Sequence, residues 1–347
     1  MNSQPLHALG WKPCFEQQLS ISEENDQIAV RVGAHLGSQI LCLTASGEIA
    51  LPVGLVEACG ELAVGDWLLL DSNTQRGVRR LDRESLIARR AAGEKARMQP
   101  IAANIDTLFI LSSCNHDFNL SRLERYLAMA TEAAVTPVVV LTKSDLCDEP
   151  DILRQQALRL TSGLVVETVD ARNMEHLENL GDWCRVGQTV ALVGSSGVGK
   201  STLAMTLGAG NIETQEIRDD DSKGRHTTTA RCIHRLAAGG LLIDTPGMRE
   251  LQLAECDSGV AEVFEEIIEL AQRCQFRDCS HEGEPGCAVQ QSIESGELDQ
   301  RRLRNYRKLQ AEQARNSQSL REQRQRSRKQ GQFYKSVIAS KRKLRNQ

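Results

Sequence analysis

The sequence is poor in aromatic residues and has no long hydrophobic run. Aromatic side chains make up 3% of the 347 residues, and few of them fall in the β-rich N-terminal part, so a platform for stacking nucleic-acid bases is not indicated there. No apolar stretch reaches the about 20 residues needed to cross a bilayer, and we expect no signal peptide. These absences argue against a membrane-spanning or exported protein and against a membrane partner, and the unpaired-looking cysteines fit the cytoplasm.

A glycine-rich segment matches the phosphate-binding pattern GxxxxGK[ST]. It runs from Gly194 to Ser201, directly after the apolar stretch 189–193. Glycines let the backbone curl so that several N–H groups face one anion, and the start of the following helix adds positive potential. Lys200 would reach the outer phosphates and Ser201 would bind Mg²⁺, so the pattern predicts a nucleoside triphosphate site. The predicted contacts are Gly194, Ser195, Ser196, Gly197, Val198, Gly199, Lys200, Ser201 and Thr202.

A second motif indicates which base is bound. The apolar stretch 138–141 is typical of a buried parallel strand, and the residues that follow it resemble the [NT]KxD motif of GTPases: Thr142, Lys143, Ser144 and Asp145. The Asp145 carboxylate can accept hydrogen bonds from guanine, whereas adenine presents an acceptor at the ring nitrogen. Thr142 stands where many GTPases carry Asn, and its single hydroxyl can hold the loop less completely. A weaker base-contacting motif is predicted at 169–171, after another strand-like segment.

Two further segments resemble the switches of GTPases. Residues 244–247, DTPG, match the DxxG motif, in which Asp244 orients Mg²⁺ and the glycine senses the terminal phosphate. The run 224–229, GRHTTT, lies where the first switch should be. One of its three threonines is expected to complete the Mg²⁺ shell. We select Thr228, although the three are chemically alike.

The position after DxxG is informative for catalysis. Ras-like enzymes carry a water-orienting Gln there, but this chain has Met248, so we expect slow intrinsic hydrolysis. His226 in the first switch either positions the water once a partner orders the loop, or packs against that partner. The predicted catalytic residues are therefore Lys200, Asp244 and the candidate His226.

The order of the motifs is unusual. The base-reading motif precedes the phosphate loop, and the two switches follow it, whereas the familiar GTPase order begins with the phosphate loop. Strand pairing and packing hold a parallel sheet together, so the chain can be opened at one place and rejoined at another with the site intact. We predict a circular permutation, in which the second switch leads directly into the C-terminal part.

That C-terminal part contains a compact C-x4-C-x-H-x5-C cluster. Three thiolates and one imidazole suit a tetrahedral, closed and therefore structural Zn²⁺ site, and the polar, glycine-rich surroundings could hardly bury free thiols. Most of the other cysteines, of 11 in total, lie in apolar runs and are interpreted as small hydrophobes. The predicted zinc ligands are Cys274, Cys279, His281 and Cys287.

The remaining segments complete a multidomain α/β prediction. Short β-rich segments separated by glycines favour a small N-terminal barrel such as an OB-fold. Residues 301–347 contain sixteen Lys and Arg against two acidic residues, which favours a polyanion such as RNA over a merely solvated helix face. The predicted divisions are a flexible N-terminus 1–27, an OB-fold 28–92, a permuted P-loop GTPase domain 98–255 with a parallel sheet and flanking helices, a zinc-binding α-helical domain 256–310 and a basic tail 311–347.

Over nearly its whole length the chain resembles the circularly permuted GTPases of the RsgA (YjeQ) family. The resemblance rests on TKSD, GSSGVGKS, GRHTTT, DTPG and the cysteine cluster. It implies an OB-fold, a C-terminal zinc domain, late maturation of the small ribosomal subunit through its rRNA, and GTP hydrolysis to GDP and phosphate stimulated by that subunit. We expect a monomer. Two alternatives remain open: a GTP-dependent switch acting on a non-ribosomal protein, and a zinc-stapled RNA-binding module in which the nucleotide is purely structural.

Overall fold

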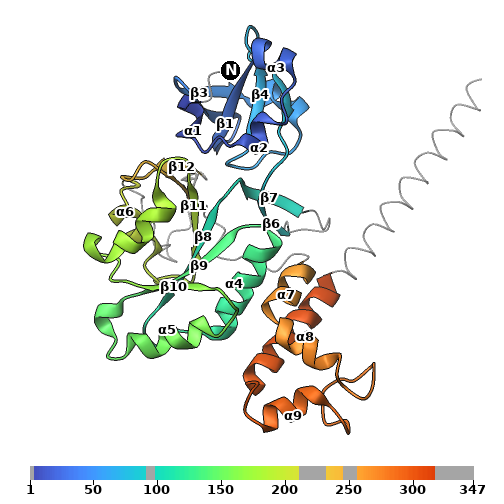
Figure 1. Ribbon diagram of the computed structural model, residues 1–347. Helices are drawn as coiled ribbons and strands as arrows, with labels where there is room; N and C mark the ends of the chain where they lie inside the picture. The colour runs from blue at the N-terminus through green and yellow to red at the C-terminus, as the bar shows by residue number, and fades with distance from the viewer. Residues whose placement is uncertain (1–3, 91–97, 211–231, 245–255, 317–347) are drawn as a thin grey trace, which may run out of the picture.

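The computed structural model describes residues 4–90, 98–210, 232–244 and 256–316. They form an N-terminal barrel, a central α/β domain and a C-terminal group of helices, seen from top to lower right in Figure 1. The barrel and the central domain share one 11-stranded sheet with the order β10-β9-β8-β11-β13-β12-β1-β2-β3, in which β4 pairs with β1 and β5 with β4. No helix in these described ranges is long and apolar enough to cross a bilayer.

The barrel consists of antiparallel strands around β1. β1 pairs with β2 along one edge and with β4 along the other, and its register shifts between Val32 and Ala34. Within the described residues no ladder joins β3 to β5, so the barrel is partly open, as OB-folds are. Its elements are β1 (Gln27–Leu36), β2 (Gln39–Thr44), β3 (Gly47–Pro52), η1 (Val53–Leu55), η2 (Glu57–Cys59), β4 (Trp67–Asp71) and β5 (Gly77–Arg80).

The residues before the barrel differ from the expected flexible segment 1–27. Residues 4–26 include three short helices, α1 (Gln4–His7), α2 (Pro13–Glu16) and α3 (Ile21–Asp26). Trp11 and Phe15 are buried, and the Trp11 ring meets Trp67 of β4 edge-on with 4.7 Å between centroids. The scarce aromatic residues are therefore used to cover one face of the barrel, and burial of such large rings is strongly stabilising.

The central domain has helices on both faces of a sheet that is parallel from β10 to β13, but its edge strand β12 runs antiparallel to β13, unlike the all-parallel sheet that was expected. Every residue of β8 is buried, as expected for a central strand covered on both sides. Packing clusters place α4 and α5 on one face and η4 and α6 on the other. The elements are β8 (Thr107–Ser113), α4 (Leu120–Glu132), β9 (Thr136–Thr142), η3 (Ser144–Leu146), α5 (Pro150–Leu158), β10 (Val165–Thr168), η4 (Met174–Cys184), β11 (Thr189–Gly194), α6 (Lys200–Thr206), β12 (Cys232–Arg235) and β13 (Leu241–Asp244).

Two features join the barrel to the central domain. The antiparallel strands β6 (Leu86–Arg90) and β7 (Met98–Ala103) lie between the two units, and β1 pairs with β12 at Ala34 and Cys232. The buried Arg31 guanidinium of β1 donates to the Thr189 hydroxyl at 2.9 Å and to the Asn104 carbonyl at 2.8 Å. Burial lowers the pKa of Arg31 to about 10. A cation held by these oxygens fixes the barrel against the base of β11.

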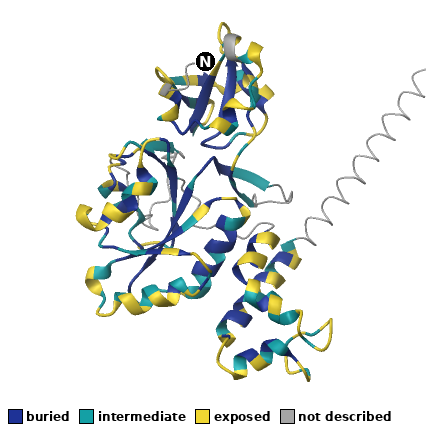
Figure 2. Cartoon of the chain, in the orientation of Figure 1, coloured by how far each residue is buried: buried dark blue, intermediate teal, exposed yellow. Residues whose placement is uncertain are grey.

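The C-terminal helices dock on α4. They are α7 (Asp257–Val263), α8 (Glu265–Ala271), α9 (Ala288–Glu294) and a helix over 300–316. The buried Glu124 of α4 accepts from Arg301 and Arg302, each at 3.0 Å, and from Asn305. The last helix continues past 310, and Glu312 pairs with Arg125 at 2.8 Å. The expected boundary at 311 therefore falls inside a docked helix rather than at the start of a tail, and Figure 2 shows the buried faces along this joint.

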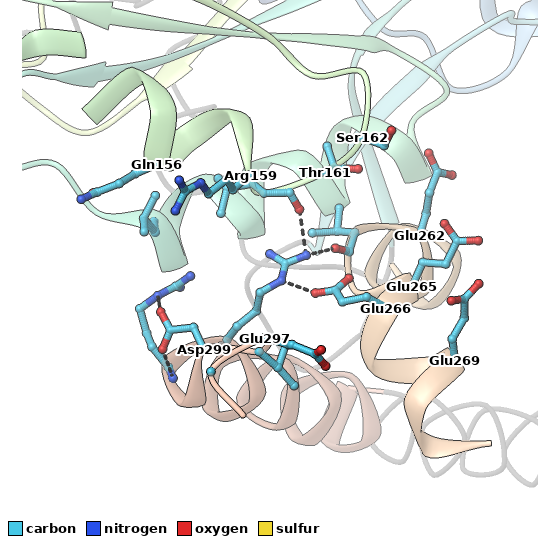
Figure 3. A pocket seen from close by; sticks show the side chains of 17 residues that line it. Gln156, Arg159, Thr161, Ser162, Glu262, Glu265, Glu266, Glu269, Glu297 and Asp299 are labelled. Atoms are coloured by element: carbon cyan, nitrogen blue, oxygen red, sulfur yellow. Dashed lines mark hydrogen bonds and ion pairs between the residues drawn. The ribbon is translucent and has the colours of Figure 1, made fainter. Parts of the chain in front are cut away.

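A groove of about 860 Å³ opens beside this joint, between the end of α5 and helices α7 and α8. Figure 3 shows this groove, with Arg159 on one side and Glu266 on the other. Arg302 spans the groove, because its guanidinium donates to the carbonyls of Leu160 at 2.7 Å and Val263 at 2.6 Å. One arginine thus bonds to the central domain and to the C-terminal helices at once. The groove is part of the seam between the two domains.

Candidate functional site

The phosphate loop follows β11 directly. Gly194, Gly197 and Gly199 have φ values of 151°, 73° and 100°, which residues with a Cβ atom rarely adopt. A Cβ on Gly194 would also lie 2.5 Å from the Leu111 carbonyl oxygen. The Lys200 ammonium donates to the carbonyls of Gly194 at 2.8 Å and of Ser195 at 2.5 Å. The loop therefore curls around the ammonium, with Ser196 and Gly197 exposed at its tip.

The base motif and the phosphate loop meet at one edge of the sheet. Thr142 ends β9, and its buried hydroxyl donates to the carbonyl of Val198 at 2.6 Å. This short bond spans 56 residues of sequence and shows that the single hydroxyl of Thr142 does reach the phosphate loop. Segments far apart in the chain are thus joined where one nucleotide could contact both.

The carboxylate of Asp145 has a partner that sequence reasoning missed. Arg172, in the loop after β10, approaches Asp145 Oδ2 to 2.6 Å and Asp170 Oδ1 to 3.0 Å. Its hydrogen bonds hold the pKa of Asp170 below the ordinary value. The weak base motif at 169–171 lies beside TKSD, because Ser144 N donates to the Val169 carbonyl at 3.3 Å. An arginine directly after a predicted base-contacting motif was the only sequence signal for this contact.

The switches are only partly described. Asp244 ends β13, which is hydrogen-bonded to β11 with Ile243 opposite Ala191. Ser201 and Thr202 lie in the first turn of α6. Asp244 and Ser201 therefore follow two neighbouring parallel strands, as a shared Mg²⁺ site requires. His226, Thr228, residues 245–247 of DTPG and Met248 lie outside the described residues.

A second missed residue contacts the phosphate loop. Asp117, between β8 and α4, accepts a hydrogen bond from the Ser195 hydroxyl at 2.6 Å and pairs with Arg122 of α4 at 2.8 Å. Partial burial raises the pKa of Asp117, but the bonds from Ser195 and Arg122 outweigh it and the pKa lies below the ordinary value. The available signal was a polar loop after a buried parallel strand, because such loops gather at the ligand-binding edge.

The predicted metal ligands form one cluster between α8 and α9. The ligand atoms of the four residues all lie within 4.8 Å of one another, so this group can hold a metal ion. Cys287 also caps α9 by accepting from the Gln290 backbone at 3.4 Å. Burial and the nearby Arg307 lower the pKa of His281, which favours the neutral imidazole that binds metals. The residues brought together are Cys274, Cys279, His281 and Cys287.

Most cysteines outside the cluster are buried in apolar surroundings. Burial raises the pKa of the Cys42 and Cys184 thiols to about 12 and that of Cys114 to about 11. Such thiols stay protonated and behave as small hydrophobes.

These features define a class: a phosphate-loop nucleotide-binding protein in which the base-reading strand precedes the phosphate loop. The RsgA GTPase family matches residues 80–254, and the chain belongs to this family and is a GTP hydrolase. A protein of Vibrio parahaemolyticus named small ribosomal subunit biogenesis GTPase RsgA 2 is 53% identical, with 98% of this chain and 95% of that protein covered. One of Mesorhizobium japonicum named small ribosomal subunit biogenesis GTPase RsgA is 46% identical, with 91% and 92% covered.

Solved structures agree on the fold. YjeQ from Thermotoga maritima is 23% identical with a TM-score of 0.59, covering 83% of this chain and 99% of that one. YloQ, described as a circularly permuted GTPase, is 22% identical with a TM-score of 0.57, covering 85% and 98%. The chain therefore has the permuted GTPase fold predicted from its motif order, followed by a helical domain that carries the Cys3His cluster.

Proposed function

We propose that this GTPase binds the small ribosomal subunit and assists its late maturation, with GTP hydrolysis to GDP and phosphate stimulated by that subunit. The observation that carries the proposal is nearly full-length identity of 53% and 46% to proteins named for small-subunit biogenesis. The basic sequence after residue 300 adds support, because each contact between a cation and an rRNA phosphate releases counterions.

In this proposal the base and the phosphates are bound by two loops joined through Thr142. Asp145 accepts from guanine, the stem of Lys143 lies along the base, and Ser144 follows in the same loop. The backbone N–H groups of 194–202 and the Lys200 ammonium hold the phosphates. The hydrogen bond from Thr142 to Val198 at 2.6 Å supports this arrangement, because it holds the base loop against the phosphate loop.

Mg²⁺ would be held by Ser201 and Asp244, with Thr228 as the switch ligand. The ion would supply charge neutralisation at the phosphates. Lys200 stabilises the charge that develops on the transferred phosphoryl group, and Asp244 orients the ion. We assign His226 to placing the attacking water, because Met248 has no hydrogen-bonding group suited to that task.

The metal of the cysteine cluster is proposed to be one structural Zn²⁺. Around a tetrahedral zinc with bonds of about 2.3 Å to sulfur and about 2.0 Å to nitrogen, sulfurs lie about 3.8 Å apart and sulfur–nitrogen pairs about 3.5 Å apart. Cys274 Sγ lies 3.9 Å from Cys287 Sγ, and His281 Nδ1 lies 3.6 Å and 3.4 Å from these two atoms. The spacing fits zinc and leaves no ligand position for water.

We propose a cytoplasmic monomer, because ribosomal subunits are assembled in the cytoplasm and each presents one copy of any rRNA surface. Size-exclusion chromatography with light scattering measures the oligomeric state and so tests the monomer. The proposed partners of this protein are the small subunit, the rRNA of that subunit, and GTP or GDP.

The deciding experiment measures GTP turnover of the full chain alone, with purified small subunits, and with purified large subunits. We expect a large increase with small subunits only. The Lys200→Ala variant controls for contaminating GTPases in the ribosome preparation. Equal turnover in all three conditions, or stimulation by large subunits instead, contradicts the ribosomal assignment.

A further inference from the structure

Asp117 lies between the phosphate loop and the joint that holds the C-terminal helices. It belongs to the short polar loop that connects β8 to α4. Its Oδ2 accepts from Ser195 Oγ at 2.6 Å and lies 2.8 Å from an Arg122 guanidinium nitrogen. Asp117 is therefore the point at which the second position of the phosphate loop is bonded to the first turns of α4.

The same helix also carries the side chains on which the C-terminal helices dock, Glu124 and Arg125, called the seat below. Glu124, two residues beyond Arg122, is fully buried under Arg301 and Arg302. One helical turn from Arg122, Arg125 makes a two-point contact with Glu312, with both distances 2.8 Å. α4 packs tightly along this seam, since a Cβ on Gly259 of α7 would come within 1.9 Å of the Ala128 carbonyl oxygen.

α4 is one continuous helix whose backbone hydrogen bonds are internal, so it links these contacts to its own first turn. The first turn of α4 is fixed to the loop that carries Asp117, because the Asn119 side chain caps the helix by accepting from Arg122 N at 3.0 Å. A continuous chain of contacts therefore runs from the C-terminal helices through Glu124 and Arg125 of α4 to Asp117 and Ser195. Hydrogen bonds to an ionised carboxylate are shorter and stronger than those between neutral groups, so the bond between Asp117 and Ser195 is a strong link in this chain of contacts.

We propose that Asp117 is a positioning residue that couples the seating of the C-terminal helices on α4 to the geometry of the phosphate loop. The proposal rests on the GTPase function above and adds a route to the nucleotide that does not pass through the second switch. Asp117 acts through Ser195. It sets how well the loop is preorganised for phosphates, and the reacting groups remain Lys200 and the switch residues.

The first test compares Asp117→Ala and Asp117→Asn with wild type in the full chain. Loss of a partly exposed, charge-assisted bond should raise the KM for GTP and the Kd for mant-GDP by about threefold to tenfold. The value of kcat should change less than twofold. Asp117→Asn keeps an acceptor for Ser195 and should recover most of the lost affinity. Asp151→Ala, which removes an exposed carboxylate from α5 of the same domain, is the matched control.

The second test is a double-variant cycle with Glu124→Gln, which weakens the seat while keeping its shape. Glu124→Gln should raise the Kd for mant-GDP in the wild-type background and have less than half that fold-effect in the Asp117→Ala background. Glu312→Gln repeats the cycle at a less buried position if Glu124→Gln fails to fold. Thermal melting and zinc content check each variant.

Two results overturn the proposal: an unchanged Kd in Asp117→Ala, or fold-effects that simply multiply in the double variants. Binding of mant-GDP requires neither hydrolysis nor ribosomes. The Kd measurements can therefore be interpreted even if small subunits prove not to stimulate GTP turnover. Failure of wild type to bind mant-GDP would instead refute the function proposed above.

Discussion

The hydroxyl of Thr142 offers the sharpest test of how the nucleotide site is built. Thr142→Val keeps the shape of the side chain but removes the donor to the Val198 carbonyl, a bond of 2.6 Å between two buried residues. Leaving a buried carbonyl without its donor costs about 1–3 kcal/mol. No other contact between Thr142 and the phosphate loop needs to change.

That cost is divided between folding and nucleotide binding. If the loop stays in place without its tie, the free energy of unfolding falls by about 1–3 kcal/mol. If the loop loosens instead, the Kd for GDP rises by about fivefold to 150-fold, since 1.4 kcal/mol is tenfold. Urea unfolding without nucleotide and mant-GDP titration measure the two parts, and their sum should be at least about 1 kcal/mol.

Two variants control the measurement. Thr142→Ser retains the hydroxyl and should stay close to wild type in nucleotide affinity. Thr136→Val makes the same substitution at the exposed start of the same strand and should change neither quantity. If Thr142→Val lowers stability by less than 0.5 kcal/mol and leaves the Kd within about twofold, the bond does not hold the loop and the reasoning fails.

Further predictions concern the base, the metal and the C-terminal joint. Asp145→Asn should weaken GTP binding by about 100-fold or more and favour xanthosine triphosphate, because the amide N–H can donate to the carbonyl that xanthine carries in place of the guanine amine. Competition of each nucleotide against mant-GDP measures both effects. Lys200→Ala should abolish turnover while elemental analysis still finds one zinc per chain, because the loop and the cysteine cluster lie in different domains. The bonds from Arg125 hold the pKa of Glu312 below its ordinary value. The pair's stabilisation should thus be complete above about pH 4.5 and be lost as the pH falls below it. The melting-temperature difference between wild type and Glu312→Gln should shrink over the same range, and a difference that grows on acidification contradicts the pairing.

Local patterns were sufficient to predict the nucleotide motifs and the metal cluster. The glycines of the phosphate loop predicted a curled backbone, and Gly194, Gly197 and Gly199 have the positive φ angles that such a curl uses. The cysteine spacing allows four ligand atoms to meet with little dependence on the rest of the fold, and they do lie within 4.8 Å of one another. In both cases the residues that cooperate are close in sequence, so their geometry follows from local backbone conformation.

The missed contacts are those between distant segments. Asp117 and Ser195 are 78 positions apart, and Arg302 and Glu124 are 178 apart. Nothing in the composition of α4 shows that Glu124 is buried, because a lone acidic residue in a helix is usually solvated and becomes buried only when a partner arrives. The N-terminus was expected to be flexible for a related reason. Its short helices show no periodic pattern of hydrophobic residues, and only the fold reveals that the Trp11 ring packs on Trp67.

The circular permutation places both appended domains next to the strand that carries the phosphate loop. β8 is the first strand of the central sheet along the chain and β13 is the last, and they flank β11, which carries the phosphate loop. The barrel therefore enters through one hydrogen-bonded neighbour of β11, and the C-terminal helices follow the other (Figure 1). The base-reading strand β9 and its neighbour β10 lie at the end of the strand order that is farthest from the barrel. We therefore expect a partner that displaces the barrel to act first on the phosphate end of the site, where GTP and GDP differ.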